Sequence, residues 1–239
     1  MSESGLSTRA MIEDKEIAQR LVEVHGRIAD AARRAGRRAD SVHLVLASKT
    51  QPPEAVAAAY QAGERLFGEN YVQEAVAKRA ALKAFTDIRW HLIGHLQRNK
   101  VKTAIETFEL IQTLDNERLA EAFFRLRHSP PMAVLIEINV GGEGSKSGVA
   151  PEHAEALIAA TRDKVEIRGL MAIPPPAPNP AGTRRYFSRL RELRDQLAAA
   201  TGLELSELSM GMTDDFEIAI EEGATIVRVG RAVFGERNQ

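Results

Sequence analysis

The sequence predicts a single-domain α/β fold, a closed (β/α)8 barrel of the TIM type with an additional N-terminal helix. Short apolar runs typical of buried strands alternate with segments of helical periodicity, in an unbroken βα rhythm of eight units. These units occupy about 200 residues, which fits the small end of the barrel size range. No break in composition marks a second domain. A doubly wound open sheet has the same alternation, so strand number alone leaves it open as an alternative.

A long amphipathic helix is predicted ahead of the first strand. Its apolar face recurs at three- and four-residue steps and ends near Gly36, because glycine commonly follows helix C-termini. That face comprises Ile17, Leu21, Val24, Ile28, Ala32 and Ala35. Residues 1–9 are polar, so we expect them to be flexible and the barrel domain with its helix to span residues 10–239.

The eight βα units follow from apolar runs and from the glycines and prolines between them. We predict strands over residues 44–47, 65–67, 88–93, 110–113, 133–139, 166–171, 205–209 and 225–229. We predict intervening helices over residues 53–62, 71–82, 98–107, 117–127, 151–162, 183–200 and 214–221. The proline-rich run over residues 173–180 holds five of the ten prolines. We interpret it as a stiff βα loop at the rim of a site rather than a domain linker.

The composition is that of an ordinary globular protein and limits the classes of function. Of the 239 residues, 44% are hydrophobic, enough for a sizeable core, and 27% are charged. The formal net charge of −1 provides no long-range field to recruit nucleic acid or an anionic membrane. The absence of cysteine excludes disulfides, thiolate metal sites and cysteine nucleophiles. We see neither a signal peptide nor an apolar run of about 20 residues, so we expect a cytoplasmic protein without membrane contact.

Lys49 is notable because it directly follows a predicted buried strand. Residues 44–47 are apolar, and Pro52 and Pro53 end the strand and can open the next helix. The lysine therefore lies at the carboxyl end of a strand, where barrels of this type bind their ligands. A lysine anchored there is poorly hydrated, so we expect its pKa to fall toward useful nucleophilicity. The alternative is an ordinary solvated loop lysine.

The loops after the last two predicted strands form a candidate phosphate site. They contain Ser209-Met210-Gly211-Met212 and Arg228-Val229-Gly230-Arg231. Small residues let the backbone approach a phosphate, and these two loops commonly bind phosphate in such barrels. Ser209 can donate its hydroxyl, while Gly230 and Arg231 can donate backbone amides. The alternative is that Gly211 and Gly230 serve only tight turns. A lysine facing a phosphate cup across a barrel mouth suggests pyridoxal 5'-phosphate held as a Schiff base.

Polar and glycine-containing segments follow most of the predicted strands. They include Ala47-Ser48-Lys49-Thr50, Phe67-Gly68-Glu69-Asn70-Tyr71-Val72-Gln73-Glu74, Trp90-His91-Leu92-Ile93-Gly94-His95-Leu96-Gln97-Arg98-Asn99-Lys100, Glu143-Gly144-Ser145-Lys146-Ser147-Gly148, Gly169-Leu170-Met171, Leu208-Ser209-Met210-Gly211-Met212 and Val227-Arg228-Val229-Gly230-Arg231-Ala232-Val233-Phe234-Gly235. Together these segments resemble the pyridoxal phosphate homeostasis proteins, the single-domain relatives of the alanine racemase barrel. The resemblance extends from about residue 10 to residue 237.

The resemblance implies a set of cofactor-binding residues: Lys49, Asn70, Ile93, Met171, Ser209, Met210, Arg228, Gly230 and Arg231. Lys49 would carry pyridoxal phosphate as a covalent imine, and Ser209, Gly230 and the backbone of Arg231 would hold its phosphate. Arg228 would face the pyridine nitrogen. Because arginine stays protonated, it would keep that nitrogen unprotonated and weaken the ring as an electron sink. Arg231 occupies a position where many relatives carry a small hydroxyl residue, which a backbone contact tolerates.

Two functions remain in competition on the sequence. The first is a carrier that binds pyridoxal phosphate, buffers it in intracellular vitamin B6 homeostasis and delivers it to apoenzymes. The second is an amino-acid racemase or a related pyridoxal phosphate-dependent enzyme. Alanine racemases add a β domain with a catalytic tyrosine, and we expect none here because the sequence ends at Gln239. Tyr60, Tyr71 and Tyr186 lie on no matching motif. We therefore favour the carrier, assign no catalytic residue, and expect a monomer, since that domain pairs racemase subunits.

His91 and His95 are four residues apart, a spacing that on a helix suggests metal ligands. Here they lie on either side of a predicted strand end and Gly94, and no carboxylate motif accompanies them, so we predict no metal site. The sequence assigns no role to either histidine, nor to Lys146.

Overall fold

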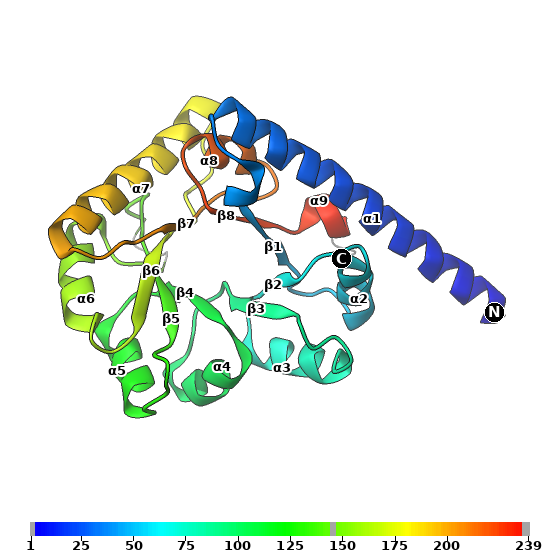
Figure 1. The fold of residues 1–239 in the computed structure, drawn as a ribbon, viewed down its shortest axis with the longest axis horizontal. Helices are drawn as coiled ribbons and strands as arrows, with labels where there is room; N and C mark the ends of the chain where they lie inside the picture. The colour runs from blue at the N-terminus through cyan, green and yellow to red at the C-terminus, as the bar shows by residue number, and fades with distance from the viewer. Residues whose placement is uncertain (1–2, 144–146, 236–239) are drawn as a thin grey trace.

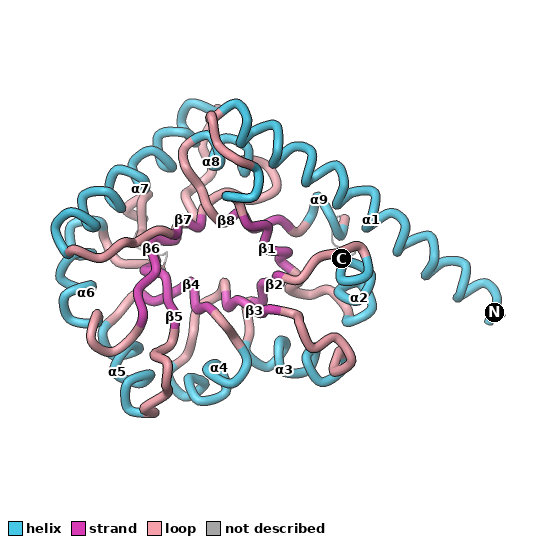
Figure 2. The backbone as a smooth tube through the Cα atoms, viewed as in Figure 1, coloured by secondary structure: helices cyan, strands magenta, loops and turns pink. Residues whose placement is uncertain are grey.

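The structure is a computed structural model that describes residues 3–143 and 147–235 (Figure 1). Eight parallel strands pair in chain order, and β1 also pairs with β8, which closes the barrel (Figure 2). Helices surround the strands on the outside. The predicted (β/α)8 barrel with an N-terminal helix is confirmed, and closure between β1 and β8 excludes the open sheet.

The barrel strands and their helices lie close to the predicted ranges. The strands are β1 (His43–Ala47), β2 (Leu66–Glu69), β3 (Arg89–Leu92), β4 (Leu110–Leu114), β5 (Ala133–Glu137), β6 (Glu166–Met171), β7 (Glu207–Ser209) and β8 (Ile226–Val229). The helices are α1 (Glu3–Arg34), α2 (Pro53–Gln61), α3 (Val72–Ala81), α4 (Val101–Thr107), α5 (Glu117–Arg125), α6 (Ala154–Thr161), α7 (Pro180–Thr201), α8 (Phe216–Glu221) and α9 (Arg231–Phe234). Short 3-10 helices are η1 (Ala39–Ser41), η2 (Arg98–Lys100) and η3 (Pro151–His153).

Two element boundaries and one additional helix differ from the prediction. β2 continues to Glu69, because Gly68 lets the strand pass close to its neighbours: a Cβ there would lie 2.8 Å from Val45 Cγ1. α7 begins at Pro180 rather than 183, because the Asn179 side chain caps it by accepting a 2.9 Å hydrogen bond from the Gly182 amide. α9 was not predicted, since four residues are too few to show helical periodicity.

The core has an inner and an outer part, which reflects the alternation of strand side chains. The inner part fills the barrel and consists of Val45, Leu66, Ile93, Leu110, Ala133, Leu135, Met171 and Ile226. The outer part lies between the strands and the helices and includes Leu44 and Leu46 on either side of Val45. Because both faces of each strand are buried, the strands are nearly continuous apolar runs.

Helix α1 covers the part of the barrel that α2, α8 and α9 also flank, and its N-terminal half extends beyond the barrel (Figure 1). The predicted apolar face is buried at Ile17, Leu21, Val24, Ile28 and Ala32, and the helix ends two residues before Gly36, which has φ of 66°. Residues 3–9, which we expected to be flexible, are part of this helix; their flexibility stays a prediction.

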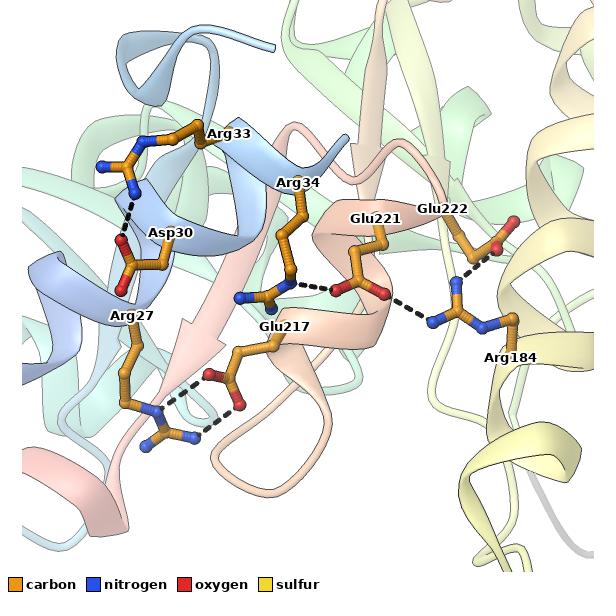
Figure 3. Close-up of polar contacts among 8 residues, drawn as sticks. All are labelled: Arg27, Asp30, Arg33, Arg34, Arg184, Glu217, Glu221 and Glu222. Atoms are coloured by element: carbon orange, nitrogen blue, oxygen red, sulfur yellow. Dashed lines mark hydrogen bonds and ion pairs between the residues drawn. The ribbon is translucent and has the colours of Figure 1, made fainter. Parts of the chain in front are cut away.

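Charged side chains fasten α1 to the C-terminal helices (Figure 3). Arg27 donates two hydrogen bonds to Glu217. Arg34 pairs with Glu221 at 2.8 Å, and Arg184 of α7 pairs with both Glu221 and Glu222. We call Arg27, Arg34, Arg184, Glu217, Glu221 and Glu222 the flank cluster. They lie on α1, on α7, on α8 and, for Glu222, directly after α8, so their contacts join α1 to elements that lie far from it in the sequence.

Within residues 3–143 and 147–235, no helix combines the length and the apolar character needed to cross a bilayer.

Candidate functional site

A cavity of about 600 Å³ opens at the carboxyl ends of the strands. Six of the predicted site residues line it: Lys49, Asn70, Ile93, Arg228, Gly230 and Arg231. The remaining lining residues are Ala47, Gln51, Ile173, Met212, Thr213, Asp214 and Gly235. Residues from the first, second, third, sixth, seventh and eighth βα units thus meet at one end of the barrel, as the fold class requires of a ligand site.

Lys49 occupies a tight turn between β1 and α2. The Gln51 amide donates a 2.9 Å hydrogen bond to the Ser48 carbonyl, which closes the turn around Lys49 and Thr50. Thr50 has φ of 66°, in the left-handed region that β-branched residues rarely adopt. Lys49 itself is half-buried and faces the cavity. Local backbone strain beside a candidate functional lysine is therefore an observed feature of this turn.

Arg228 on β8 lies at the base of the cavity and is 4% exposed. One terminal nitrogen donates to Ser209 Oγ at 2.6 Å, and the other donates to the Ala172 carbonyl at 2.9 Å. Burial lowers the pKa of the Arg228 guanidinium to about 10, although nearby Glu137 and Asp215 oppose this shift. Arg228 therefore remains protonated at neutral pH, held in one orientation by its two anchored nitrogens.

The loops after β7 and β8, for which the sequence predicts a phosphate cup, contact each other. Arg231 forms an ion pair with Asp214, and Thr213 Oγ1 accepts a hydrogen bond from the Ala232 amide. Gly230 allows β8 to approach β1, because a Cβ there would lie 3.0 Å from the Ala47 carbonyl oxygen. The first amides of any helix lack intrahelical partners, so the backbone of Gly230 and Arg231 at the start of α9 is suited to an anion.

Asn70 and Ile93 come from the loops after β2 and β3. These loops touch at Gly94, where a Cβ would lie 2.5 Å from the Asn70 carbonyl oxygen. The Ile93 side chain belongs to the inner core and forms part of the cavity wall. The close contact at Gly94 therefore brings the loops of Asn70 and Ile93 together, and both residues line the cavity.

Three predicted residues are not brought to the cavity wall. Met171 is fully buried in the inner core, and Met210 is fully buried in the outer core. The Ser209 hydroxyl donates a 2.6 Å hydrogen bond to Gln112 Oε1 and accepts one from Arg228. The sequence showed that these residues lie at strand ends but not which way each side chain turns. Ser209 thus anchors Arg228, and its role toward a phosphate stays a prediction.

Three buried polar side chains, His91, Gln112 and Ser209, are linked by hydrogen bonds within the barrel. Gln112 bridges Ser209 and His91, with its Nε2 3.0 Å from His91 Nδ1. Burial lowers the pKa of His91 to about 3, so this histidine is neutral in the folded protein. His95 is largely exposed, with Nδ1 3.8 Å from Asp115. The two histidines, considered together as possible metal ligands, have separate surroundings. Lys146 lies outside the described residues.

Glu137 on β5 is a buried acid that the sequence analysis missed. It shares a strand face with Ala133 and Leu135, so it points into the barrel, and its Oε2 has no hydrogen-bond partner among the described residues. Burial raises the pKa of Glu137 to about 7; Asp115 adds to this shift and Arg228 opposes it. The signal available in the sequence was a single carboxylate within an otherwise apolar strand.

Comparisons with known proteins show what this chain is similar to. The family described as "Alanine racemase, N-terminal domain" matches residues 25–238. A protein of Aquifex aeolicus named "Pyridoxal phosphate homeostasis protein" is 48% identical over 223 residues, which cover 92% of this chain and 97% of the relative.

Solved structures give the same picture of the fold. A structure of PipY from Synechococcus elongatus with PLP bound has a TM-score of 0.78 and 37% identity, covering 92% of this chain and all of PipY. An alanine racemase from Corynebacterium glutamicum has a TM-score of 0.69 at 18% identity and covers 94% of this chain but 62% of the racemase. The racemase likeness concerns the barrel fold alone.

Proposed function

The chain belongs to the alanine racemase N-terminal domain family and, within it, to the pyridoxal phosphate homeostasis proteins, and from that premise we propose that it binds pyridoxal 5'-phosphate in the cavity at the barrel mouth. The observation that carries the proposal is the placement of Lys49 on the wall of a cavity that also contains the β7–β8 cup. A carrier role in vitamin B6 homeostasis, with buffering and delivery of the cofactor to apoenzymes, is the function we propose.

The residues present fit this cofactor. The half-buried amine of Lys49 can bind the aldehyde, the backbone at Gly230 and Arg231 can bind the phosphate, and Asn70 and Ile93 can line the ring. Gly230 is suited to close approach, since the position admits no Cβ without a tight contact to Ala47. When bound, pyridoxal phosphate supplies an aldehyde that forms an imine with a primary amine and releases water.

Arg228 gives the site a chemical bias against carbanion chemistry. Its guanidinium is protonated at neutral pH and is fixed by Ser209 and Ala172. A protonated group placed at the pyridine nitrogen would keep that nitrogen unprotonated, so the ring would withdraw electrons weakly. This supports a carrier more than a racemase. Among the described residues that line the cavity, none is a tyrosine that could act as the second acid/base of a racemase.

The wider features of the carrier proposal rest on the sequence. A net charge near zero suits a protein without nucleic-acid or membrane partners. We propose that the protein is a monomer and that it is located in the cytoplasm. Size-exclusion chromatography with light scattering measures the oligomeric state directly.

Absorbance spectroscopy with peptide mapping tests the proposal. The purified protein is mixed with pyridoxal phosphate, scanned in the visible range, reduced with borohydride and digested. We expect an imine band and a label fixed on Lys49, and we expect Lys49→Ala to lose both while unfolding at the same temperature as the parent. Lys164→Ala, a surface lysine outside the cavity, is the matched control and should keep the band. A label scattered over surface lysines would overturn the proposal.

A further inference from the structure

Lys78 on α3 is a buried lysine that the proposed function leaves unexplained. Its side chain is 5% exposed, and lysine is rarely buried unless it is paired. Its ammonium donates to the Ser48 carbonyl at 2.6 Å, to Glu69 Oε1 at 2.7 Å and to Glu74 Oε1 at 3.0 Å. An ammonium has three donors, so each N–H of Lys78 has a partner. One of these partners is the residue immediately before Lys49.

The two carboxylates bound by Lys78 also hold the Lys49 turn. Glu69 Oε1 accepts a 2.6 Å hydrogen bond from the Ser48 hydroxyl, and Glu74 Oε1 accepts one of the same length from the Thr50 amide. The Ser48 amide donates to the Gly68 carbonyl of β2 at 3.0 Å. The residues on both sides of Lys49 are therefore hydrogen-bonded to β2 and α3.

From these contacts we propose that Lys78, Glu69 and Glu74 are positioning residues that set the orientation of Lys49 toward pyridoxal phosphate, which deepens the proposed function and rests on it. We call Lys78, Glu69, Glu74 and Ser48 the Lys78 cluster. It holds the backbone on either side of Lys49 while leaving the Lys49 side chain directed to the cavity.

The left-handed conformation of Thr50 explains why such a cluster is needed. A threonine at φ of 66° is costly, and a strained residue persists only when its surroundings fix it. Glu74 fixes it by accepting from the Thr50 amide, and Lys78 fixes Glu74 in turn. Without the cluster, the turn is expected to relax and to move the Lys49 amine away from its reactive placement.

The arrangement also explains the burial of Glu69. This carboxylate is fully buried, and burial raises its pKa, although the hydrogen bonds from Lys78 and Ser48 oppose the shift. A buried glutamate at the end of a strand is tolerated when a cation and a hydroxyl compensate it. Lys78 thus has two connected effects: it compensates the charge of Glu69, and it donates a hydrogen bond to the Ser48 carbonyl oxygen.

Hydrogen exchange and imine titration test the proposal on four variants. The apo proteins Glu74→Ala, Glu74→Gln, Lys78→Met and Lys164→Met are compared with the parent for amide exchange in residues 48–51, for imine formation with pyridoxal phosphate, and for the pH midpoint of the imine band. We expect Glu74→Ala and Lys78→Met to exchange faster at the turn, to slow imine formation by about tenfold to a hundredfold, and to shift the pH midpoint. Glu74→Gln keeps an oxygen acceptor and should behave nearly as the parent.

The control separates positioning from general stability. Lys164 also pairs with two glutamates, Glu117 and Glu121, but contacts nothing in the Lys49 turn, so Lys164→Met should match the parent in every readout. If Lys78→Met fails to fold, the comparison of Glu74→Ala with Glu74→Gln still tests the positioning role. Parent-like exchange, imine rate and pH midpoint in Glu74→Ala would overturn the positioning role. If the parent itself forms no imine, the proposed function fails, and exchange at residues 48–51 still tests the cluster.

Discussion

The Lys78 cluster and the flank cluster are both built from basic residues bridging pairs of glutamates, but they differ in burial. Lys78 and Glu69 are 5% and 0% exposed, whereas Arg184 and Glu221 are 44% and 21% exposed. Exposed ion pairs are screened by water and salt, while a buried charge depends on its partner. The comparison indicates that similar bonding patterns should have different energetic effects: breaking the buried Lys78–Glu69 pair should cost more stability than breaking a pair of the exposed flank cluster.

The largest expected effect comes from breaking the buried cluster. Lys78→Met leaves the Glu69 carboxylate buried without its cation, so we expect the free energy of unfolding to fall by about 3–5 kcal/mol. Urea denaturation of the apo protein at neutral pH measures this. A loss below about 1 kcal/mol would place the Lys78 cluster in the same class as the surface pairs.

The next effect concerns Glu137, a buried acid that forms no ion pair with another residue of the described ranges 3–143 and 147–235. Its pKa is raised to about 7 in the folded protein, from 4.5 for an unperturbed glutamate. Between these values the unfolded chain binds fewer protons than the folded protein, so Glu137 makes stability fall as pH rises from about 4.5 to 7. We expect Glu137→Gln to remove this loss and to be more stable than the parent at pH 8 by roughly 3 kcal/mol.

Denaturation of the parent and of Glu137→Gln across this pH range measures the difference. His91 acts in the opposite direction, because its pKa is lowered to about 3 from 6.5 and the unfolded chain therefore takes up its proton first as pH falls. As pH rises from about 4.5 to 6.5, where the two effects overlap, the Glu137→Gln variant should consequently gain stability more steeply than the parent. Identical pH profiles for the two proteins would show that Glu137 is ionised in the folded state.

The smallest effect is expected in the flank cluster. Arg184→Ala removes contacts to Glu221 and Glu222, yet Arg34 and Arg191 still pair with these glutamates. We expect a loss of no more than about 1 kcal/mol, which should shrink further in about 1 M salt. Denaturation at low and high salt measures it. A loss as large as that of Lys78→Met would remove the distinction between the two clusters.

Local patterns were sufficient to predict the barrel and much of its mouth. The alternation of apolar runs and helical segments gave the order of the elements, and the position of Lys49 after an apolar strand placed it on the cavity wall. Gly230, Arg231 and Arg228 also line the cavity, because Arg228 is the penultimate residue of β8 and Gly230 and Arg231 follow the strand. These features depend on residues close together in the sequence.

The sequence by itself determined the fold class, the end of the barrel that carries the site and the lysine at its wall. Only the tertiary structure decided which charged and polar groups are buried together: Ser209 with Gln112, 97 residues away, Ser48 with Lys78, and Glu137 near Arg228. The physical reason is that periodicity follows from the geometry of one strand or helix, whereas the surroundings of a buried charge are formed by several elements at once.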